Sequence, residues 1–162
     1  MSRVDWRIRR ARRGGVDVRI PTEERDVLRT LPDNVREALQ GMDPTRPGDD
    51  PAVARLYPGA YLDNDDHDAE YRRLMHGELH EGRLAALDAF EEAIDADHLD
   101  EDRAWAWLRA LNDIRLLLGT RLDVTEGEVI RRANPDDPRA ASLALYGYLS
   151  WLEEQLVEAL SD

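Results

Sequence analysis

The sequence predicts a mainly α-helical fold, a multi-helix bundle with an N-terminal β-hairpin that adds a small sheet. After residue 20, long stretches repeat apolar side chains every three or four positions, which is the period of one helix face. The first 20 residues instead alternate apolar and polar side chains around two adjacent glycines, which is typical of a hairpin. At 162 residues, we expect a single domain, 1–162, with one hydrophobic core.

The segment 1–20 is predicted to be an arginine-rich β-hairpin that turns at two glycines. A two-residue Gly14-Gly15 turn would place the apolar side chains of the two strands on opposite faces, because a slip of one residue reverses every side chain. A three-residue turn that includes the preceding arginine pairs Ile8 with Ile20 and collects the apolar side chains on one face. We favour the three-residue turn. The opposite face then carries Arg3, Arg7, Arg9, Arg13 and Arg19.

Two helices are expected next, a kinked helix over 21–40 and a long helix over 68–95. Pro32 kinks or splits the first, because proline lacks the N–H that the helix needs. Gly77 and Gly82 weaken the second by about 1 kcal/mol each, which leaves open whether this helix is continuous or breaks there.

The remaining segments complete the predicted bundle. Residues 41–67 are rich in Pro, Gly and Asp and are expected to form a surface loop. Residues 100–122 are apolar on almost every side and predict a central helix. A capping-box spacing predicts a short helix over 125–133, and a leucine stripe predicts a C-terminal helix over 138–160.

Charge is distributed unevenly along this acidic chain. The formal net charge is −13, yet residues 1–20 hold seven arginines and two aspartates, a net +5 that leaves −18 for the rest. No stretch approaches the roughly 20 apolar residues that span a bilayer, and no apolar run follows the arginines as in a secretory signal. We therefore expect a cytoplasmic protein that does not enter a membrane. Cysteine is absent, so the chain forms no disulfide and has no thiolate nucleophile.

Two segments superficially resemble metal sites. His76 and His80 lie one helical turn apart, but zincin chemistry needs a glutamate directly after the first histidine, where this chain has Gly77. The acidic run 63–68 resembles a calcium loop, but its sixth position is Asp68 rather than glycine. We predict no metal, no cofactor, no catalytic residue and no enzymatic activity.

Charged and amide side chains interrupt the apolar central helix. A buried carboxylate or guanidinium needs an ionic partner, so these side chains form either an internal network or an exposed polar patch used by a ligand or partner. The internal network is favoured. The residues are Arg109, Asn112, Asp113, Arg115 and Arg121.

The arginine-coated hairpin face is the second candidate surface. β-Ribbon proteins place such faces on DNA phosphates. Here the net charge of −18 on the rest of the chain repels DNA. The carboxylates that carry this charge are also available to pair with the arginines. Pairing with acidic groups of this chain or of a protein partner is therefore favoured over DNA. The candidate interaction residues are Arg7, Arg9, Arg13 and Arg19.

Four segments form a recognisable combination: the arginine-rich start with Gly14-Gly15, the Leu56-Tyr57-Pro58 to Tyr61 segment, the Trp107–Leu122 run and the closing Tyr146 to Leu160 helix. Together they resemble an actinobacterial family of AosR-type oxidative-stress regulators, long known only as a domain of unknown function. The resemblance implies a transcription regulator of the oxidative-stress response that contacts a sigma factor or RNA polymerase. In that branch redox sensing is attributed to a cysteine pair, which this chain lacks.

Two other functions remain open at this point. A direct DNA-binding protein would use the hairpin arginines, and its binding would fall steeply with salt. More distantly, a metal-dependent enzyme would use His76 and His80 and would co-purify with its metal. The sequence leaves the oligomeric state undetermined.

Overall fold

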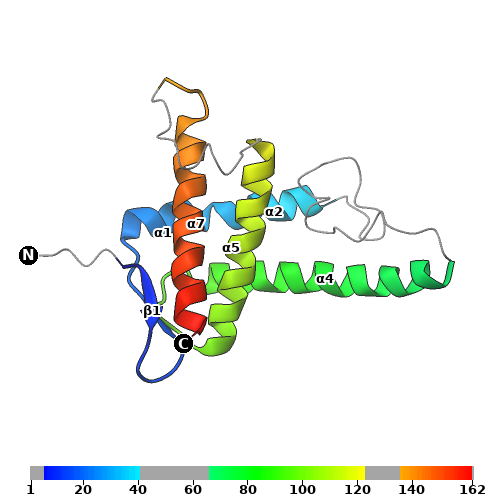
Figure 1. Ribbon diagram of the computed structural model, residues 1–162, viewed down its shortest axis with the longest axis horizontal. Helices are drawn as coiled ribbons and strands as arrows, with labels where there is room; N and C mark the ends of the chain where they lie inside the picture. The colour runs from blue at the N-terminus through cyan, green and yellow to red at the C-terminus, as the bar shows by residue number, and fades with distance from the viewer. Residues whose placement is uncertain (1–5, 41–65, 123–135, 162) are drawn as a thin grey trace, which may run out of the picture.

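The computed structural model describes residues 6–40, 66–122 and 136–161, and it confirms a mainly helical fold with a small sheet (Figure 1). The predicted loop over 41–67 lies almost entirely outside the described residues, and the predicted short helix over 125–133 lies wholly outside them. No helix in the described part is long and apolar enough to cross a membrane. The elements are β1 (Ile8–Arg10), β2 (Val16–Val18), α1 (Thr22–Arg29), α2 (Leu31–Leu39), α4 (Asp66–Glu92), β3 (His98–Leu99), α5 (Glu101–Arg121) and α7 (Ala140–Ser161).

The hairpin of β1 and β2 forms, but with a different register from the predicted one. Ile8 pairs with Val18 rather than with Ile20, so the predicted three-residue turn is wrong. The connection is longer and begins at Ala11, whose N–H donates to the carbonyl of Gly15 at 3.0 Å. Because the error is two residues and not one, the side chains keep their predicted faces, and Ile8, Val16 and Val18 are all buried.

A third strand, β3, was not predicted. It joins the open edge of β2 antiparallel, with Leu99 opposite Val16, and the sheet order is β1-β2-β3. The backbone N–H of Val18 donates to the carbonyl of Asp97 at 2.8 Å, just before this strand begins. Two residues between two helices are too few to show an alternating pattern, so no local pattern predicts this strand.

The segment predicted as one kinked helix consists of α1 and α2. Pro32 lies in the first turn of α2, where a missing N–H costs nothing, so the chain starts a new helix instead of kinking an old one. The hydroxyl of Thr30, between the two helices, donates to the carbonyl of Val27 at 2.7 Å.

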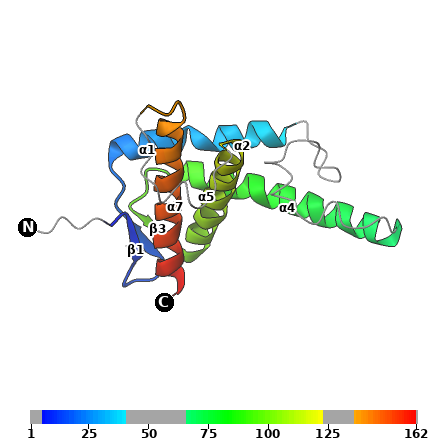
Figure 2. The same ribbon diagram turned by 45° about the horizontal axis from the view of Figure 1, so that its top comes forward.

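Helix α4 runs without a break through Gly77 and Gly82, so the long helix predicted over 68–95 forms in spite of the two glycines. In both views its N-terminal half extends away from the other described helices (Figures 1 and 2). Its C-terminal half packs on α5, where the rings of Phe90 and Trp107 lie 4.7 Å apart. Packing of this half offsets the low helix propensity of Gly82, which lies near Arg109 of α5.

Helix α5 is central, as its apolar character indicates, since α2, α4 and α7 all pack against it. It begins at a cap in which the Asp100 carboxylate accepts the backbone N–H of Arg103 at 2.8 Å. Helix α7 lies along α5 and also covers β1, so the N-terminal strand and the C-terminal helix are neighbours (Figure 1). This neighbourhood positions the candidate surface.

Candidate interaction surface

Arg7 is drawn into the protein and does not lie on an open arginine face. Its guanidinium contacts the Glu24 carboxylate on α1 through two nitrogens, at 3.0 and 3.1 Å. The hydroxyl of Tyr148 on α7 donates to the same carboxylate at 2.6 Å, and the Arg7 guanidinium also lies 5.5 Å from the ring of Trp151. The hydrogen bond from Arg7 is the main reason that the pKa of Glu24 lies below its usual value. Arg7, Glu24 and Tyr148 therefore form a clasp that ties the hairpin to α1 and α7.

The other three predicted hairpin arginines, Arg9, Arg13 and Arg19, are exposed. The guanidinium of Arg9 lies 4.1 Å from the centre of the Trp6 ring, and that of Arg19 lies 6.0 Å from it. A cation over a tryptophan face is attracted by the ring and is held in a defined place. Two more exposed arginines adjoin them at the hairpin connection. We call the whole set the arginine surface: Trp6, Arg9, Arg10, Arg12, Arg13 and Arg19.

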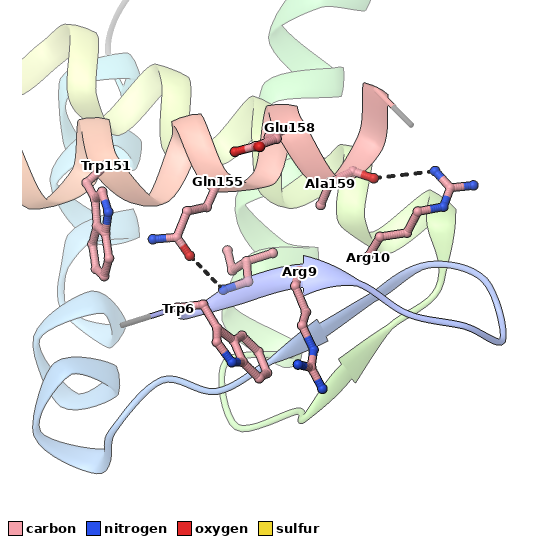
Figure 3. Close-up of a pocket in the computed structure, with 8 residues that line it drawn as sticks. Trp6, Arg9, Arg10, Trp151, Gln155, Glu158 and Ala159 are labelled. Atoms are coloured by element: carbon pink, nitrogen blue, oxygen red, sulfur yellow. Dashed lines mark hydrogen bonds between the residues drawn. The ribbon is translucent and has the colours of Figure 1, made fainter. Parts of the chain in front are cut away.

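A hollow lies beside this surface, between β1 and α7 (Figure 3). Its volume is about 370 Å³. In Figure 3 Trp151 stands at one end and Arg10 at the other, while Trp6 and Arg9 lie on the strand side. The Arg10 guanidinium donates to the carbonyl of Ala159 at 3.4 Å and closes that end of the hollow. The lining residues are Trp6, Ile8, Arg9, Arg10, Trp151, Gln155, Glu158 and Ala159.

The floor of the hollow is fixed by Gln155. Its side-chain oxygen accepts the backbone N–H groups of Arg7 at 2.8 Å and of Ile8 at 3.1 Å. Because both partners are donors, the atom that faces them must be the amide oxygen, which fixes the orientation of the amide. Its nitrogen is buried and makes no hydrogen bond within the described part of the chain, an arrangement that typically costs about 1–3 kcal/mol.

The second candidate group, on α5, is divided between the protein interior and the surface. Asp113 is buried and faces Arg83 of α4 at 3.6 Å, whereas Arg115 lies 2.6 Å from Glu153 of α7. Asn112 accepts a hydrogen bond of 3.4 Å from Arg115. These contacts join three helices through ionic side chains.

Burial controls the acidity of this network. It raises the pKa of Asp113, against the opposing influence of Arg83 and then of Arg109. Burial likewise raises the pKa of Glu153, against the pairing with Arg115. Arg109 and Arg121 are themselves exposed, and Arg121 ends α5. The five predicted residues therefore do not form one continuous patch.

The described residues contain no group of three His, Cys, Asp or Glu side chains that could hold a metal ion. His80 is half-buried on α4. The side chains of His76 and of the acidic run 63–68 lie outside the described part.

Sequence reasoning missed the α7 side of the hollow and two of the arginines. Trp151, Gln155 and Glu158 recur at spacings of four and three, which place them on one helix face, and this pattern was available in the sequence. Arg10 and Arg12 are absent from the predicted arginine face, because alternation places them with Ile8 on the other side; β1 ends at Arg10, and the alternation ends with it. Nothing local indicated which element would cover β1.

Comparison with known proteins gives a consistent family. Residues 3–160 match the family described as Domain of unknown function (DUF2017). The chain is 32% identical over 132 residues to proteins named oxidative stress regulator AosR from Mycobacterium tuberculosis and Mycobacterium bovis, an alignment that covers 71% of this chain. It is 30% identical over 129 residues, 69% of this chain, to a putative oxidative stress regulator AosR from Mycobacterium leprae. The chain spans about 60% of the length of these relatives. No solved structure matches it.

Proposed function

The chain belongs to the DUF2017 family, and from this premise we propose that it is a non-enzymatic regulator of transcription in the oxidative-stress response. It acts in the cytoplasm through protein contacts with the transcription machinery, a sigma factor or RNA polymerase. The names of the curated relatives support the regulatory role. The contact with a sigma factor or RNA polymerase is what the family resemblance implies, and the arginine surface supports a protein partner for the chain.

The observation that carries the proposal is the exposed arginine surface on a strongly acidic protein. Arg9, Arg13 and Arg19 are exposed, and no ion pair joins any of the three to another residue of the described part. Arginine and tryptophan are enriched at the energetic centres of protein interfaces. A cationic patch of this kind selects a partner with a complementary acidic surface and speeds the encounter.

The acidic remainder of the chain favours a protein over DNA as this partner. A net charge of −18 outside residues 1–20 repels a polyanion at every distance at which charges are unscreened. A folded acidic protein carries both signs of charge and can orient its acidic patch toward the arginines. Direct DNA binding through the same arginines is the second candidate.

This chain itself forms no disulfide, because it contains no cysteine. We propose that its regulatory state follows from binding its partner and not from its own oxidation. The buried network around Asp113 and Arg115 then serves to hold α4, α5 and α7 together.

Affinity capture of the tagged full chain from its native cytoplasm tests the proposal. The capture is made at low and at moderate salt, followed by mass spectrometry of bound proteins and sequencing of bound DNA. The test variant carries Arg9→Glu and Arg13→Glu. The control is Arg121→Glu, which makes the same kind of change at an exposed arginine at the far end of α5.

Recovery of sigma factor or polymerase subunits that survives nuclease treatment, is lost in the double variant and persists in the control is the expected result. Enriched promoter DNA that is lost in the double variant, with steep salt dependence, would instead establish direct DNA binding. Recovery of neither would refute the contact with the transcription machinery.

A further inference from the structure

We propose that the hollow between β1 and α7 is a docking groove for an extended acidic segment of a protein partner. One apolar side chain of that segment is seated between Trp6 and Trp151, and its carboxylates pair with Arg9 and Arg10. The inference rests on the proposed function and deepens it, because it names the chemistry of the partner at the arginine surface.

The charges along the groove determine which charge a segment bound there must carry. Arg9 is exposed and held over the Trp6 ring at 4.1 Å, and no ion pair links it to any other described side chain. Arg10 stands at the end of the same hollow, fixed by its bond to the carbonyl of Ala159. A guanidinium donates parallel N–H groups that match a carboxylate. Two of them placed along one strand therefore suit a partner with acidic side chains at more than one position.

Glu158 distinguishes a polypeptide from a nucleic acid as the occupant. Its carboxylate lines the hollow together with the arginines, is exposed and makes no hydrogen bond or ion pair with the described residues. An ionised carboxylate only accepts hydrogen bonds, and a phosphate backbone also only accepts, so the two repel each other. An extended peptide brings backbone N–H donors for Glu158 as well as carboxylates for the arginines.

The walls of the hollow provide the apolar contact. Trp6, Ile8, Trp151 and Ala159 all line it. A volume of about 370 Å³ is near the lower end of the range for ligand sites, roughly 300–1,000 Å³, and is suited to a group of side-chain size. Trp6 and Trp151 are half-buried, and tryptophan beside arginine is the usual composition of an energetic centre in an interface.

The groove is organised before any partner arrives. The Trp151 ring lies 6.1 Å from that of Tyr148 and 5.5 Å from the Arg7 guanidinium, and Gln155 is held by two backbone N–H groups. Groups that are already held in place lose little freedom on binding. The groove therefore needs no rearrangement of β1 or α7 to accept an extended chain.

Fluorescence polarisation with the full-length protein tests the groove. The probe is a short, fluorescently labelled synthetic peptide that has glutamates on both sides of one central leucine. A second peptide replaces the leucine by serine, and a third replaces the glutamates by glutamine. Because these changes are made in the probe, they test both halves of the recognition without any risk to the fold.

Binding of the leucine-containing acidic peptide, with roughly tenfold weaker binding of each altered peptide, is expected. Arg9→Glu should weaken binding by at least about tenfold, and Trp6→Ala by a similar factor. Glu158→Arg should weaken it, because the backbone N–H groups of the peptide lose their acceptor in the groove. Glu37→Arg on α2 is the matched control, since it makes the same change of charge at an exposed glutamate outside the hollow.

Equal effects of Glu158→Arg and Glu37→Arg, or equal binding of the leucine and serine peptides, would overturn the groove, because either result indicates non-specific attraction by charge. Tighter binding of single-stranded DNA than of the acidic peptide would also overturn it. Dimers in light scattering that Arg9→Glu dissociates would assign the surface to a second copy of this chain, contrary to the proposal.

Failure of this inference is separable from failure of the proposed function. Groove-dependent peptide binding, together with capture of no sigma factor or polymerase subunit, would leave the groove in place and refute the role in transcription. Capture of those subunits, lost on mutation of the arginines but unaffected by Trp6→Ala and Glu158→Arg, would keep the role and refute the groove.

Discussion

The hydroxyl of Tyr148 on α7 donates a 2.6 Å hydrogen bond to the carboxylate of Glu24 on α1, and Arg7 donates to the same carboxylate from the hairpin. The carboxylate of Glu24 on α1 thus connects the N-terminal hairpin to the C-terminal helix α7. Truncation of the hydroxyl in Tyr148→Phe should lower the free energy of unfolding by about 1–2 kcal/mol, since the bond has a charged acceptor. Urea unfolding followed by fluorescence measures this loss.

The same clasp predicts a dependence on acid. The pKa of Glu24 is lowered in the folded protein, mainly by the hydrogen bond from Arg7, so its contribution is present at neutral pH and is lost as the pH falls through that lowered value. The stability difference between wild type and Glu24→Gln should therefore shrink as the pH drops below about 4. Glu23→Gln, at the exposed neighbouring position, is the control. A difference that stays constant down to pH 3 would contradict the assigned pairing.

Arg25 is buried and satisfies backbone carbonyls at the junction of three elements. Its guanidinium donates to the carbonyls of Ile20 and Ile94 at 2.7 Å each and of Ala96 at 2.9 Å. Arg25→Met keeps much of the apolar stem but removes every donor, so we expect a loss of roughly 3 kcal/mol or more in unfolding free energy. Arg25→Lys should recover only part of it, because an ammonium cannot reproduce the planar fork.

Arg29 provides the matched control for this loss. It pairs with Asp95 at 3.0 Å, but both side chains are exposed. Solvent screens such a pair, so Arg29→Met should cost much less unfolding free energy than Arg25→Met. Similar losses for the two substitutions would show that Arg25 acts through its charge and not through the buried carbonyls.

The contribution of Asp113 to stability is expected to change with pH in the opposite direction to that of Glu24. Asp113→Ala should destabilise the fold by about 3 kcal/mol or more, because Arg83 loses its buried partner. Burial raises the pKa of Asp113, so folding favours its protonated form. Relative to Asp113→Asn, the wild type should therefore gain stability as the pH falls from above the raised pKa toward about 3.9. An unchanged melting temperature of Asp113→Ala would contradict the structural role and favour a binding surface.

Local sequence patterns were sufficient for the helices but not for their partners. Helical spacing located α5 and α7 within two residues, because each buries a long apolar stripe whose period is visible in one segment. The clasp joins residues that are 17 and 124 positions apart in the sequence. Gln155 accepts hydrogen bonds from Arg7 and Ile8, which lie 148 and 147 positions before it. No periodicity within a segment carries that information. The sequence therefore predicted part of the candidate surface, namely arginines of the hairpin. It did not predict the residues of α7 that line the hollow.

The error in hairpin register has the same cause and leads to the last prediction. Gly15 adopts φ 69°, and a Cβ there would collide with the carbonyl oxygen of Leu99 in the unpredicted strand β3. Gly14 adopts φ 92° with open space around it. Gly14→Ala should thus lose only the roughly 1–2 kcal/mol of a left-handed alanine, whereas Gly15→Ala must also push β3 away from the hairpin.

The comparison of these two alanine variants measures the contact between the turn and β3, because the backbone strain is common to both. We expect Gly15→Ala to have the lower melting temperature and to expose the amide of Val18, which bonds to the carbonyl of Asp97, to faster hydrogen exchange. Equal melting temperatures and equal protection of that amide would show that the turn is set by the hairpin alone. The register would then be independent of β3, and the longer connection would need another cause.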